Sequence, residues 1–264
     1  MKNTYALITG SSSGIGLEMA KEIAKKGYNL ILVSIETEKL QELKEELSKE
    51  YNVKVEVFSS NLARKEAAQE LYDYCKPFDV EILINNAGFF FFGQIIYADL
   101  EKAANKIQLH VLTVSLLCTL FGKDFKEKGR GYIMNTSSMS IYKEFPTIGY
   151  YGATKAYLNY FTRALRYELK YYGVNVTCLL PGATITNLYD PNVVNLELGR
   201  KTGIMLPADF VAKQAVKDMF KGKARSIPGL STKLSVMFMK ILPEWVIYQI
   251  RSLKMVEKLI EPKK

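Results

Sequence analysis

The sequence predicts an α/β fold in which a doubly wound parallel sheet is flanked by helices. Short apolar segments of strand length alternate along the chain with longer segments whose apolar residues recur at helical spacing. The first apolar segment leads directly into a glycine-rich turn, as in a strand–turn–helix unit. Because no linker rich in Pro, Gly or Ser divides the 264 residues, we expect a single domain.

Six segments have the length and the apolar residues of strands. They are Tyr5–Ile8, Leu30–Val33, Val53–Val57, Val80–Ile84, Tyr132–Met134 and Asn175–Leu180. Each is followed by a segment with helical character. In chain order these segments contain Met19–Ala24, Leu40–Leu47, residues 64–75, residues 99–125, Tyr151–Lys155 and a helix that opens near Pro207. Ligands of such sheets bind at the carboxyl ends of the strands, so we expect the functional residues there.

The first strand is followed by the run Thr9–Gly16, with glycines at positions 10, 14 and 16. Glycines permit a tight turn and a close approach of the backbone to a ligand. The amino terminus of the following helix offers free N–H groups to a pyrophosphate. The run therefore predicts a dinucleotide site; the alternative is an ordinary Gly/Ser loop.

Ser138, Tyr151 and Lys155 form a second pattern. A phenol has a pKa of roughly 10, and a nearby ammonium group lowers it. Residues four apart on a helix share one face, so Tyr151 and Lys155 are expected to point into one site. Ser138 is expected at the tip of a strand facing them. The three groups suit proton transfer to a carbonyl oxygen; the alternative is a solvated helix face, since the chain contains 17 tyrosines.

Together with Asn85–Gly88 and Pro181–Gly182, these motifs resemble the short-chain dehydrogenase/reductase family over roughly residues 5 to 190. The resemblance implies a single-domain Rossmann-type fold and hydride transfer with a nicotinamide cofactor. Within the family, the chain is most similar to 3-ketoacyl-CoA reductases and 17β-hydroxysteroid dehydrogenases. We accordingly expect a catalytic domain over residues 1–230 that contains a substrate lid at about 187–206, and a basic amphipathic helical extension of the same domain over 231–264.

The resemblance also implies roles for individual residues. Tyr151 would donate the proton in reduction, Lys155 would lower the Tyr151 pKa and bind the nicotinamide ribose, and Ser138 would hold the substrate carbonyl. Besides Tyr151 and Lys155, the implied cofactor-binding residues are Gly10, Ser12, Ser13, Gly14, Ile15, Gly16, Ser34, Asn61, Leu62, Asn86, Ala87, Gly88, Pro181, Gly182 and Thr186. Asn86 has the alternative of a purely structural hydrogen bond at the sheet edge, and Thr186 that of an ordinary surface residue.

The chain departs from the family at His110, its only histidine, which stands where the family has an asparagine of a water relay. His110 is therefore a fourth candidate catalytic residue, because imidazole donates, accepts and titrates near neutrality. The alternative is a partly buried histidine bonded to a backbone carbonyl.

The cofactor is predicted from the residues after the second strand. Ser34 occupies the position at which an acidic residue selects NAD, and its hydroxyl does not repel a 2′-phosphate. Lys39 is close enough in sequence to approach that phosphate, whereas Glu36 favours the ribose hydroxyl of NAD. We predict NADP, with NAD as the alternative.

Composition limits the remaining classes of function. The net charge is +9, but charges of mixed sign over residues 39–49 and the lack of a nucleic-acid motif favour a solvated surface. Cys75, Cys118 and Cys178 lie far apart and are expected to be buried thiols, and no metal-ligand spacing occurs. A strand begins almost at once and no uninterrupted apolar run reaches ~18 residues, so we expect neither a signal peptide nor a membrane span, and a cytoplasmic location.

Apolar segments near the expected site suggest the kind of substrate. Phe89–Phe92 follow the Asn-Asn-Ala-Gly motif, and the expected lid at 187–206 is rich in apolar residues. Both favour a lipophilic carbonyl compound such as an acyl chain or a steroid. The amphipathic tail is expected to cap the cleft or to form an interface of a homo-oligomer, a dimer or tetramer; peripheral membrane contact is the less favoured alternative.

The sequence thus predicts an oxidoreductase that interconverts a ketone and a secondary alcohol, with a small molecule as its partner and no nucleic acid. Two alternatives remain: a non-catalytic nucleotide-binding or scaffold protein on the same fold, and an adaptor that binds lipid surfaces through the tail. Fold by itself does not decide among them.

Overall fold

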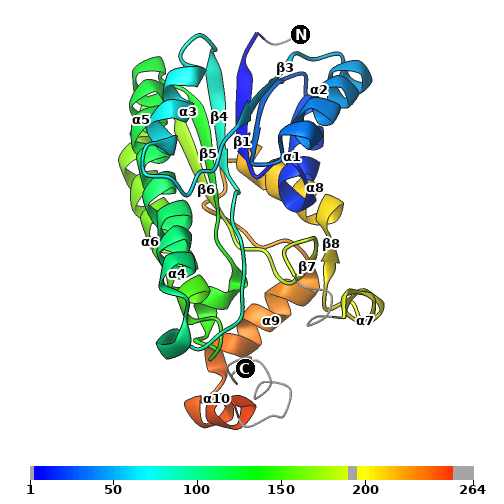
Figure 1. The fold of residues 1–264 in the computed structure, drawn as a ribbon, viewed down its shortest axis with the longest axis vertical. Helices are drawn as coiled ribbons and strands as arrows, with labels where there is room; N and C mark the ends of the chain where they lie inside the picture. The colour runs from blue at the N-terminus through cyan, green and yellow to red at the C-terminus, as the bar shows by residue number, and fades with distance from the viewer. Residues whose placement is uncertain (1–2, 190–194, 252–264) are drawn as a thin grey trace.

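The computed structural model, which describes residues 3–189 and 195–251, contains a parallel sheet of seven strands (Figure 1). Its strand order is β3-β2-β1-β4-β5-β6-β9. The strands are β1 (Tyr5–Thr9), β2 (Asn29–Ser34), β3 (Val55–Ser59), β4 (Val80–Asn85), β5 (Gly131–Thr136), β6 (Val174–Leu179) and β9 (Arg225–Ser226). The predicted fold class is confirmed, since helices cover both faces of this sheet.

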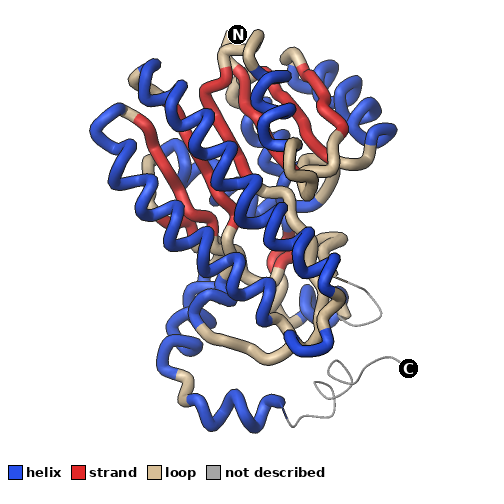
Figure 2. Tube along the Cα trace, turned by 60° about the vertical axis from the view of Figure 1, so that its left-hand side comes forward, coloured by secondary structure: helices blue, strands red, loops and turns tan. Residues whose placement is uncertain are grey.

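The two helical layers divide the core into two clusters (Figures 1 and 2). One layer contains α1 (Gly14–Ala24), α2 (Thr37–Tyr51) and α8 (Ala208–Phe220), and the other contains α3 (Ala67–Cys75), α5 (Val114–Lys128) and α6 (Gly149–Leu169). In β2, Leu30 and Leu32 belong to the first cluster and Ile31 and Val33 to the second. Side chains that alternate between the faces explain why this strand is apolar throughout.

A continuous helix runs from Leu100 to Lys128 and is interrupted only by a change in winding. It comprises α4 (Leu100–Ile107), a π-helical segment η2 (Gln108–Thr113) and α5. By length and composition alone this helix could cross a membrane, whereas the sequence was expected to contain no such span. Its residues Leu117, Phe121 and Phe125 are buried in the second cluster, so packing on the sheet accounts for its apolar character.

The carboxyl ends of the strands carry the irregular part of the molecule. The short helix η3 (Met139–Tyr142) follows β5, and a small sheet of β7 (Thr184–Ile185) and β8 (Leu206–Pro207) with α7 (Leu196–Lys201) follows β6. At the opposite end of the sheet, η4 (Lys170–Tyr172) joins α6 to β6. A further short helix, η1 (Ile95–Tyr97), follows β4. Below the sheet, α9 (Leu230–Ile241) and α10 (Glu244–Arg251) project away from it (Figures 1 and 2).

The boundaries of the predicted elements are shifted in places. β3 begins at Val55 rather than Val53, and α3 begins at Ala67 rather than at position 64. The edge strand β9 has only two residues, too few to give a periodic signal. It forms because Arg225 and Ser226 pair with β6, a contact that the sequence pattern does not encode.

Candidate active site

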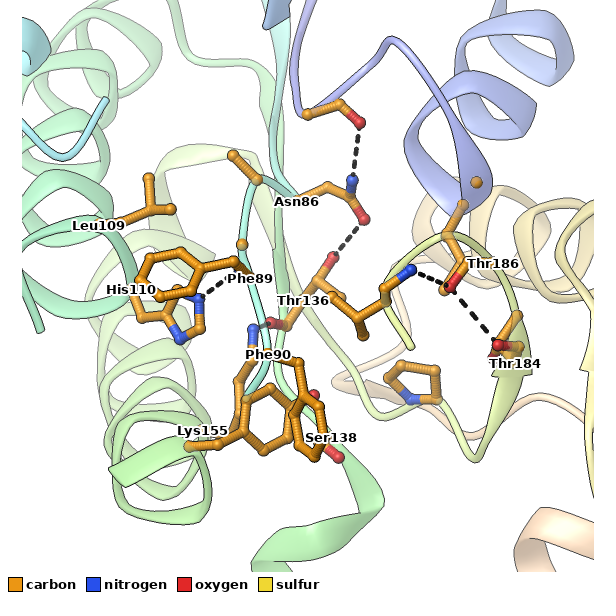
Figure 3. A pocket seen from close by; sticks show the side chains of 18 of the residues that line it. Asn86, Phe89, Phe90, Leu109, His110, Thr136, Ser138, Lys155, Thr184 and Thr186 are labelled. Carbon is orange, nitrogen blue, oxygen red and sulfur yellow. Dashed lines mark hydrogen bonds between the residues drawn. The ribbon is translucent and has the colours of Figure 1, made fainter. Parts of the chain in front are cut away.

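A cavity of about 790 Å³ lies at the carboxyl ends of the central strands. It extends from the glycine loop after β1 past the ends of β4 and β5 to the segment after β6 (Figure 3). The strand order reverses between β1 and β4, and ligands of doubly wound sheets bind at such a reversal. The fold therefore places one large cavity where the sequence motifs converge.

The glycine loop is shaped by contacts that no side chain would permit. Gly10 and Gly14 have positive φ angles of 65° and 56°. A Cβ on Gly10 would lie 2.7 Å from Ala87 Cα, and one on Gly16 would lie 2.1 Å from the Gly10 carbonyl oxygen. The amino terminus of α1 is not capped by the side chain of Ser13, which leaves its first N–H groups directed at the cavity. This cradle fits a dinucleotide pyrophosphate.

Asn86 joins the ends of three neighbouring strands (Figure 3). Its Nδ2 donates to the carbonyl oxygens of Thr9 and Gly10 at 3.3 and 3.2 Å, and its Oδ1 accepts from Thr136 Oγ1 at 3.4 Å. The backbone N–H groups of Asn86 and Ala87 both donate to Thr9 Oγ1. The structural alternative for Asn86 is thus present, and the residue also lines the cavity.

The far end of the cavity, where an adenosine ribose would lie, is polar and contains one carboxylate. Glu36 Oε2 accepts a short hydrogen bond from Ser12, and Ser34 Oγ donates to Ser12 Oγ at 2.9 Å. Lys39, which the sequence offered as a phosphate ligand, instead pairs with Glu42 at 3.1 Å. Glu36 is therefore better placed than the sequence indicated to influence the choice of cofactor.

Ser138, Tyr151 and Lys155 converge on the opposite end of the cavity. Ser138 follows the end of β5 and caps η3, where its Oγ accepts from the Ser140 N–H at 3.1 Å. Lys155 is buried, and its Nζ lies 5.5 Å from the centroid of the Tyr151 ring. That Nζ donates to the Thr136 carbonyl oxygen at 2.8 Å, which fixes its position at the cavity wall (Figure 3).

The pKa values in this site differ from the sequence-based expectation. Burial, followed by the neighbouring Tyr189, raises the pKa of Tyr151, and only the hydrogen bond with Ser138 lowers it. Burial also lowers the pKa of Lys155 to about 7, assisted by the positive charge of Lys106. The expected lowering of the Tyr151 pKa by Lys155 is therefore not found in the protein by itself, because burial of the phenol dominates.

His110 lies in the π-helical segment and has both ring nitrogens occupied (Figure 3). Nε2 accepts from the Phe89 N–H at 3.2 Å, and Nδ1 lies 3.0 Å from Thr154 Oγ1. Because Thr154 Oγ1 donates to the Tyr151 carbonyl, Nδ1 must carry the ring proton. Burial and the charges of Lys155 and Lys106 hold the His110 pKa well below its ordinary value. This geometry suits a neutral, positioning histidine better than one that titrates.

Three of the four consecutive phenylalanines, Phe89, Phe90 and Phe92, line the cavity. The Phe90 ring meets those of Tyr151 and Tyr189 at centroid distances of 4.9 and 5.7 Å. Met239 of α9 completes the wall. The catalytic end of the cavity is therefore largely apolar.

Lys106 of α4 is a residue that the sequence analysis missed. It is fully buried, and its Nζ lies 5.6 Å from the centroid of the Tyr151 ring. The signal was its position four residues before His110, on the same helix face. Sequence analysis missed it because a lysine in the middle of an amphipathic helix is normally expected to face solvent.

Of the predicted site residues, only Gly16 does not line the cavity; its contact with Gly10 packs α1 against the loop instead. The cavity-lining predictions are Gly10, Ser12, Ser13, Gly14, Ile15, Ser34, Asn61, Leu62, Asn86, Ala87, Gly88, His110, Ser138, Tyr151, Lys155, Pro181, Gly182 and Thr186. Thr186 lies close to Gly14, since a Cβ added to Gly14 would lie 3.0 Å from the methyl group of Thr186. Positions 190–194 of the predicted lid and 252–264 of the tail lie outside the described residues.

The three cysteines are free and buried, and burial raises the pKa of each thiol to about 12. Over residues 3–189 and 195–251, no three His, Cys, Asp or Glu side chains lie together as metal ligands would.

The sequence of the chain is similar to those of known proteins. The short chain dehydrogenase family matches residues 4–195. The chain is 31% identical to hydroxysteroid dehydrogenase-like protein 1 of Gallus gallus over 92% of this chain and 73% of that protein. It is 29% identical to inactive hydroxysteroid dehydrogenase-like protein 1 of Homo sapiens, with the same coverage. It is 27% identical to very-long-chain 3-oxoacyl-CoA reductase of Bos taurus over 93% of this chain and 78% of that protein.

Solved structures give the same result. A structure described in a study of 7beta-hydroxysteroid dehydrogenase stereoselectivity superposes with a TM-score of 0.85 at 26% identity, covering 95% of this chain and 97% of that one. A short-chain dehydrogenase from Sphingobium yanoikuyae in complex with NADPH gives 0.80 at 27% identity, covering 95% and 96%.

Proposed function

The chain belongs to the short-chain dehydrogenase family and is a nicotinamide-dependent oxidoreductase, and from this premise we propose that it interconverts a lipophilic ketone and its secondary alcohol. The observation that carries the proposal is the meeting of Ser138, Tyr151 and Lys155 on one wall of a largely apolar cavity. A carbonyl that enters this end of the cavity meets the Ser138 hydroxyl and the Tyr151 hydroxyl together. Ser138 caps η3 directly after β5, and Tyr151 lies in α6, so regular elements on both sides fix the spacing of the two hydroxyls.

Each residue has a distinct task in this proposal. When bound, the nicotinamide supplies or accepts the hydride. Tyr151 Oη gives a proton to the carbonyl oxygen in reduction and takes it back in oxidation. Ser138 Oγ holds that oxygen by a hydrogen bond. Lys155 Nζ, fixed by the Thr136 carbonyl, is placed to bind the ribose next to the nicotinamide. When Lys155 is protonated, its ammonium group would also stabilise the Tyr151 phenolate.

The nature of the wall supports a lipophilic substrate. The residues that line the cavity include Phe90, Phe92, Leu188, Tyr189 and Met239, and the Phe90 ring contacts that of Tyr151. Apolar side chains bury acyl or steroid carbon at about 25 cal/mol per Å². The names of the relatives, a very-long-chain 3-oxoacyl-CoA reductase and hydroxysteroid dehydrogenases, agree with this class of substrate.

The rival proposal is a non-catalytic protein on the same fold. Its support is the relative from Homo sapiens that is named inactive. Against it, this chain has the hydroxyl, the phenol and the amine of the reaction, and all three line the cavity. A protein that only bound a nucleotide would not require Tyr151 there.

We propose NADP as the preferred cofactor. Ser34 leaves room for a 2′-phosphate without repulsion, and the structural relative from Sphingobium yanoikuyae carries NADPH. Glu36 opposes this choice, because its carboxylate lies at the same end of the cavity. NAD is the alternative, and the balance depends on Glu36.

The remaining proposals concern the surroundings of the enzyme. We propose that the protein is a cytoplasmic homo-oligomer. We also propose that α9 caps the cleft, because Met239 lines the cavity and Lys240 Nζ lies 5.0 Å from the centroid of the Tyr142 ring. Peripheral membrane contact through the tail stays the less favoured alternative. Liposome flotation of the full chain against a form truncated after residue 251 would distinguish the two, since only membrane contact gives tail-dependent flotation.

The test of the proposed function is a panel of carbonyl compounds followed by nicotinamide absorbance, with each cofactor. We expect turnover of long-chain 3-oxoacyl or steroid ketones that falls by about 10²- to 10⁴-fold in Tyr151→Phe, which removes one hydroxyl. Tyr150→Phe, one position earlier, is the matched control. Binding of cofactor without turnover of any compound would favour the non-catalytic rival.

A further inference from the structure

Lys106 combines complete burial with an ammonium group that has no polar partner. Its exposed fraction is 0%, and Nζ has no hydrogen-bond partner among the residues that the structure describes. Buried lysines are normally paired, because removing an ammonium group from water is costly. A leucine or methionine would fill this space without that cost. Its presence therefore calls for an explanation beyond packing.

An aromatic cage surrounds the ammonium group. Nζ lies 3.6 Å from the centroid of the Phe91 ring, 5.1 Å from that of Phe89 and 5.7 Å from that of Phe90. The faces of aromatic rings attract cations, and the attraction is strongest where water is excluded. The cage thus holds the positive charge in place but does not neutralise it. A carboxylate, by contrast, would neutralise it.

The cage opens onto the catalytic tyrosine. The Tyr151 ring is the fourth aromatic ring around Lys106, at 5.6 Å, and Lys155 Nζ lies 5.5 Å from the same ring. Two ammonium groups are therefore about equally distant from one phenol ring. Lys106 does not line the cavity, so it is separated from substrate by the phenylalanines.

The titratable groups around Lys106 come from two other elements. Tyr151 and Lys155 face it from α6, and His110 faces it from the π-helical segment η2. The segment with Phe89–Phe91 contributes only apolar rings. On α4 itself, Glu101 and Lys102 are exposed. In the described part of the chain, no acidic side chain forms an ion pair or a hydrogen bond with Lys106 Nζ.

We propose that Lys106 is a positioning residue of the active site: a caged cation that favours the less protonated forms of the Tyr151–Lys155 pair. The proposal rests on the proposed function, because it gives that pair its catalytic role. A fixed positive charge makes proton loss easier from the phenol and from the ammonium group alike. The sign is thus the same whichever of the two groups loses the proton, and the pair titrates as a unit.

Two consequences follow for the reaction. In oxidation, the Tyr151 phenolate accepts the proton of the alcohol, and the charge of Lys106 makes that phenolate available at lower pH. In reduction, the phenol donates its proton, and the same charge lowers the barrier to its release. The low pKa of Lys155, for which burial is the first cause and Lys106 the second, agrees with this arrangement.

The experiment observes Lys155 directly, without turnover. The full chain is labelled with ¹³Cε-lysine and titrated by NMR, and the Lys155 and Lys106 signals are assigned from their loss in Lys155→Met and Lys106→Met. In Lys106→Met, which keeps the length of the side chain and removes the charge, we expect the Lys155 midpoint to rise by about 0.5 to 1 pH unit. Lys106→Arg, which keeps the charge, should restore the wild-type midpoint. Lys102→Met, one turn earlier on the exposed side of α4, should leave it unchanged.

A kinetic measurement provides the second readout. If the chain oxidises the alcohol that corresponds to a ketone of the panel, the rising limb of its kcat/KM profile should move to higher pH by a similar amount in Lys106→Met, and not in Lys102→Met. An unchanged Lys155 midpoint in a folded Lys106→Met protein would overturn the proposal. Absence of turnover with a shifted midpoint would leave Lys106 as proposed and would contradict the proposed function instead.

Discussion

The two ends of the cavity are built on opposite principles. At the nucleotide end, the backbone N–H and the side-chain amide of Asn86, which follows β4, bond to Thr9 and Gly10 at the end of β1. At the catalytic end, the described residues offer Lys106 Nζ no polar partner, and Lys155 Nζ donates to the Thr136 carbonyl oxygen. The nucleotide end thus depends on shape and satisfied hydrogen bonds. The catalytic end depends on charged groups that are buried at a cost in solvation free energy.

The difference predicts how each end responds to mutation. A change in the nucleotide end disturbs close backbone contacts, and so it should lower stability and cofactor affinity together. A change in the catalytic end can remove an unfavourable burial, and so it can raise stability while impairing chemistry. Four predictions test this contrast, from the largest effect to the smallest.

Gly16→Ala should have the largest effect. Its Cβ would lie 2.1 Å from the Gly10 carbonyl oxygen, so the loop must move away from α1. We expect unfolding free energy to fall by about 1 to 3 kcal/mol and the Kd for cofactor to rise at least about tenfold. Urea unfolding and fluorescence titration measure these quantities. Gly93→Ala, whose Cβ would meet nothing within 4 Å, is the control; equal losses in both variants would refute the steric argument.

Lys106→Met should stabilise the protein. Burial lowers the pKa of Lys106 from 10.5 to about 8, which corresponds to a cost of up to about 3 kcal/mol that the aromatic cage partly offsets. We expect a gain of about 1 to 3 kcal/mol at pH 7. Between about pH 8 and 10.5 the unfolded chain binds more protons at this residue than the folded one, so wild-type stability rises with pH and the gain shrinks. Urea unfolding at pH 7 and pH 10 measures it; a loss of stability at pH 7 would show that the cage compensates fully.

Glu36→Gln should change the cofactor preference at the polar end. Among the described residues that line the cavity, Glu36 is the only acidic one. Removing its charge should lower the KM for NADP about three- to tenfold, with a smaller change for NAD, because only NADP carries the 2′-phosphate. Glu38→Gln, on the exposed surface of α2, is the matched control. A parallel change for both cofactors would place the 2′ position away from Glu36.

His110→Asn should have the smallest effect on the pH profile. Because the His110 pKa lies well below its ordinary value, the ring is neutral throughout the working range and does not titrate. We expect an unchanged profile of kcat/KM and a loss of about 1 kcal/mol in stability, since the bond to the Phe89 N–H is lost. A displaced profile would restore the relay role that the sequence suggested.

Local sequence was sufficient for most of the fold. The strand β2, apolar throughout, and the helix α2, with Leu40, Leu43 and Leu47 on one face, were identified because their periodicity reflects burial directly. The two-residue strands β7, β8 and β9 were not, since they exist only through pairing with distant segments. The helices α9 and α10, by contrast, fall almost entirely within the amphipathic helical extension that the sequence predicted over residues 231–264.

For the site, motif spacing identified the residues but not their state. Glycine spacing and the Tyr151–Lys155 interval are local, so the sequence placed both on the cavity. The pKa values of Tyr151 and Lys155 depend on how much water the fold removes, and that quantity is a sum over Phe90, Tyr189 and other distant residues. The sequence therefore predicted the opposite direction for the phenol.

By itself, the sequence determined the order of the first six strands and their helices, the family and the motif residues at the cavity, because each follows from spacing along the chain. Only the tertiary structure decided that Lys106 is enclosed by aromatic rings, that His110 is neutral and that Glu36 reaches Ser12. These features arise where segments distant in sequence exclude water from one another. Charge and protonation follow from that exclusion, and no local pattern records it.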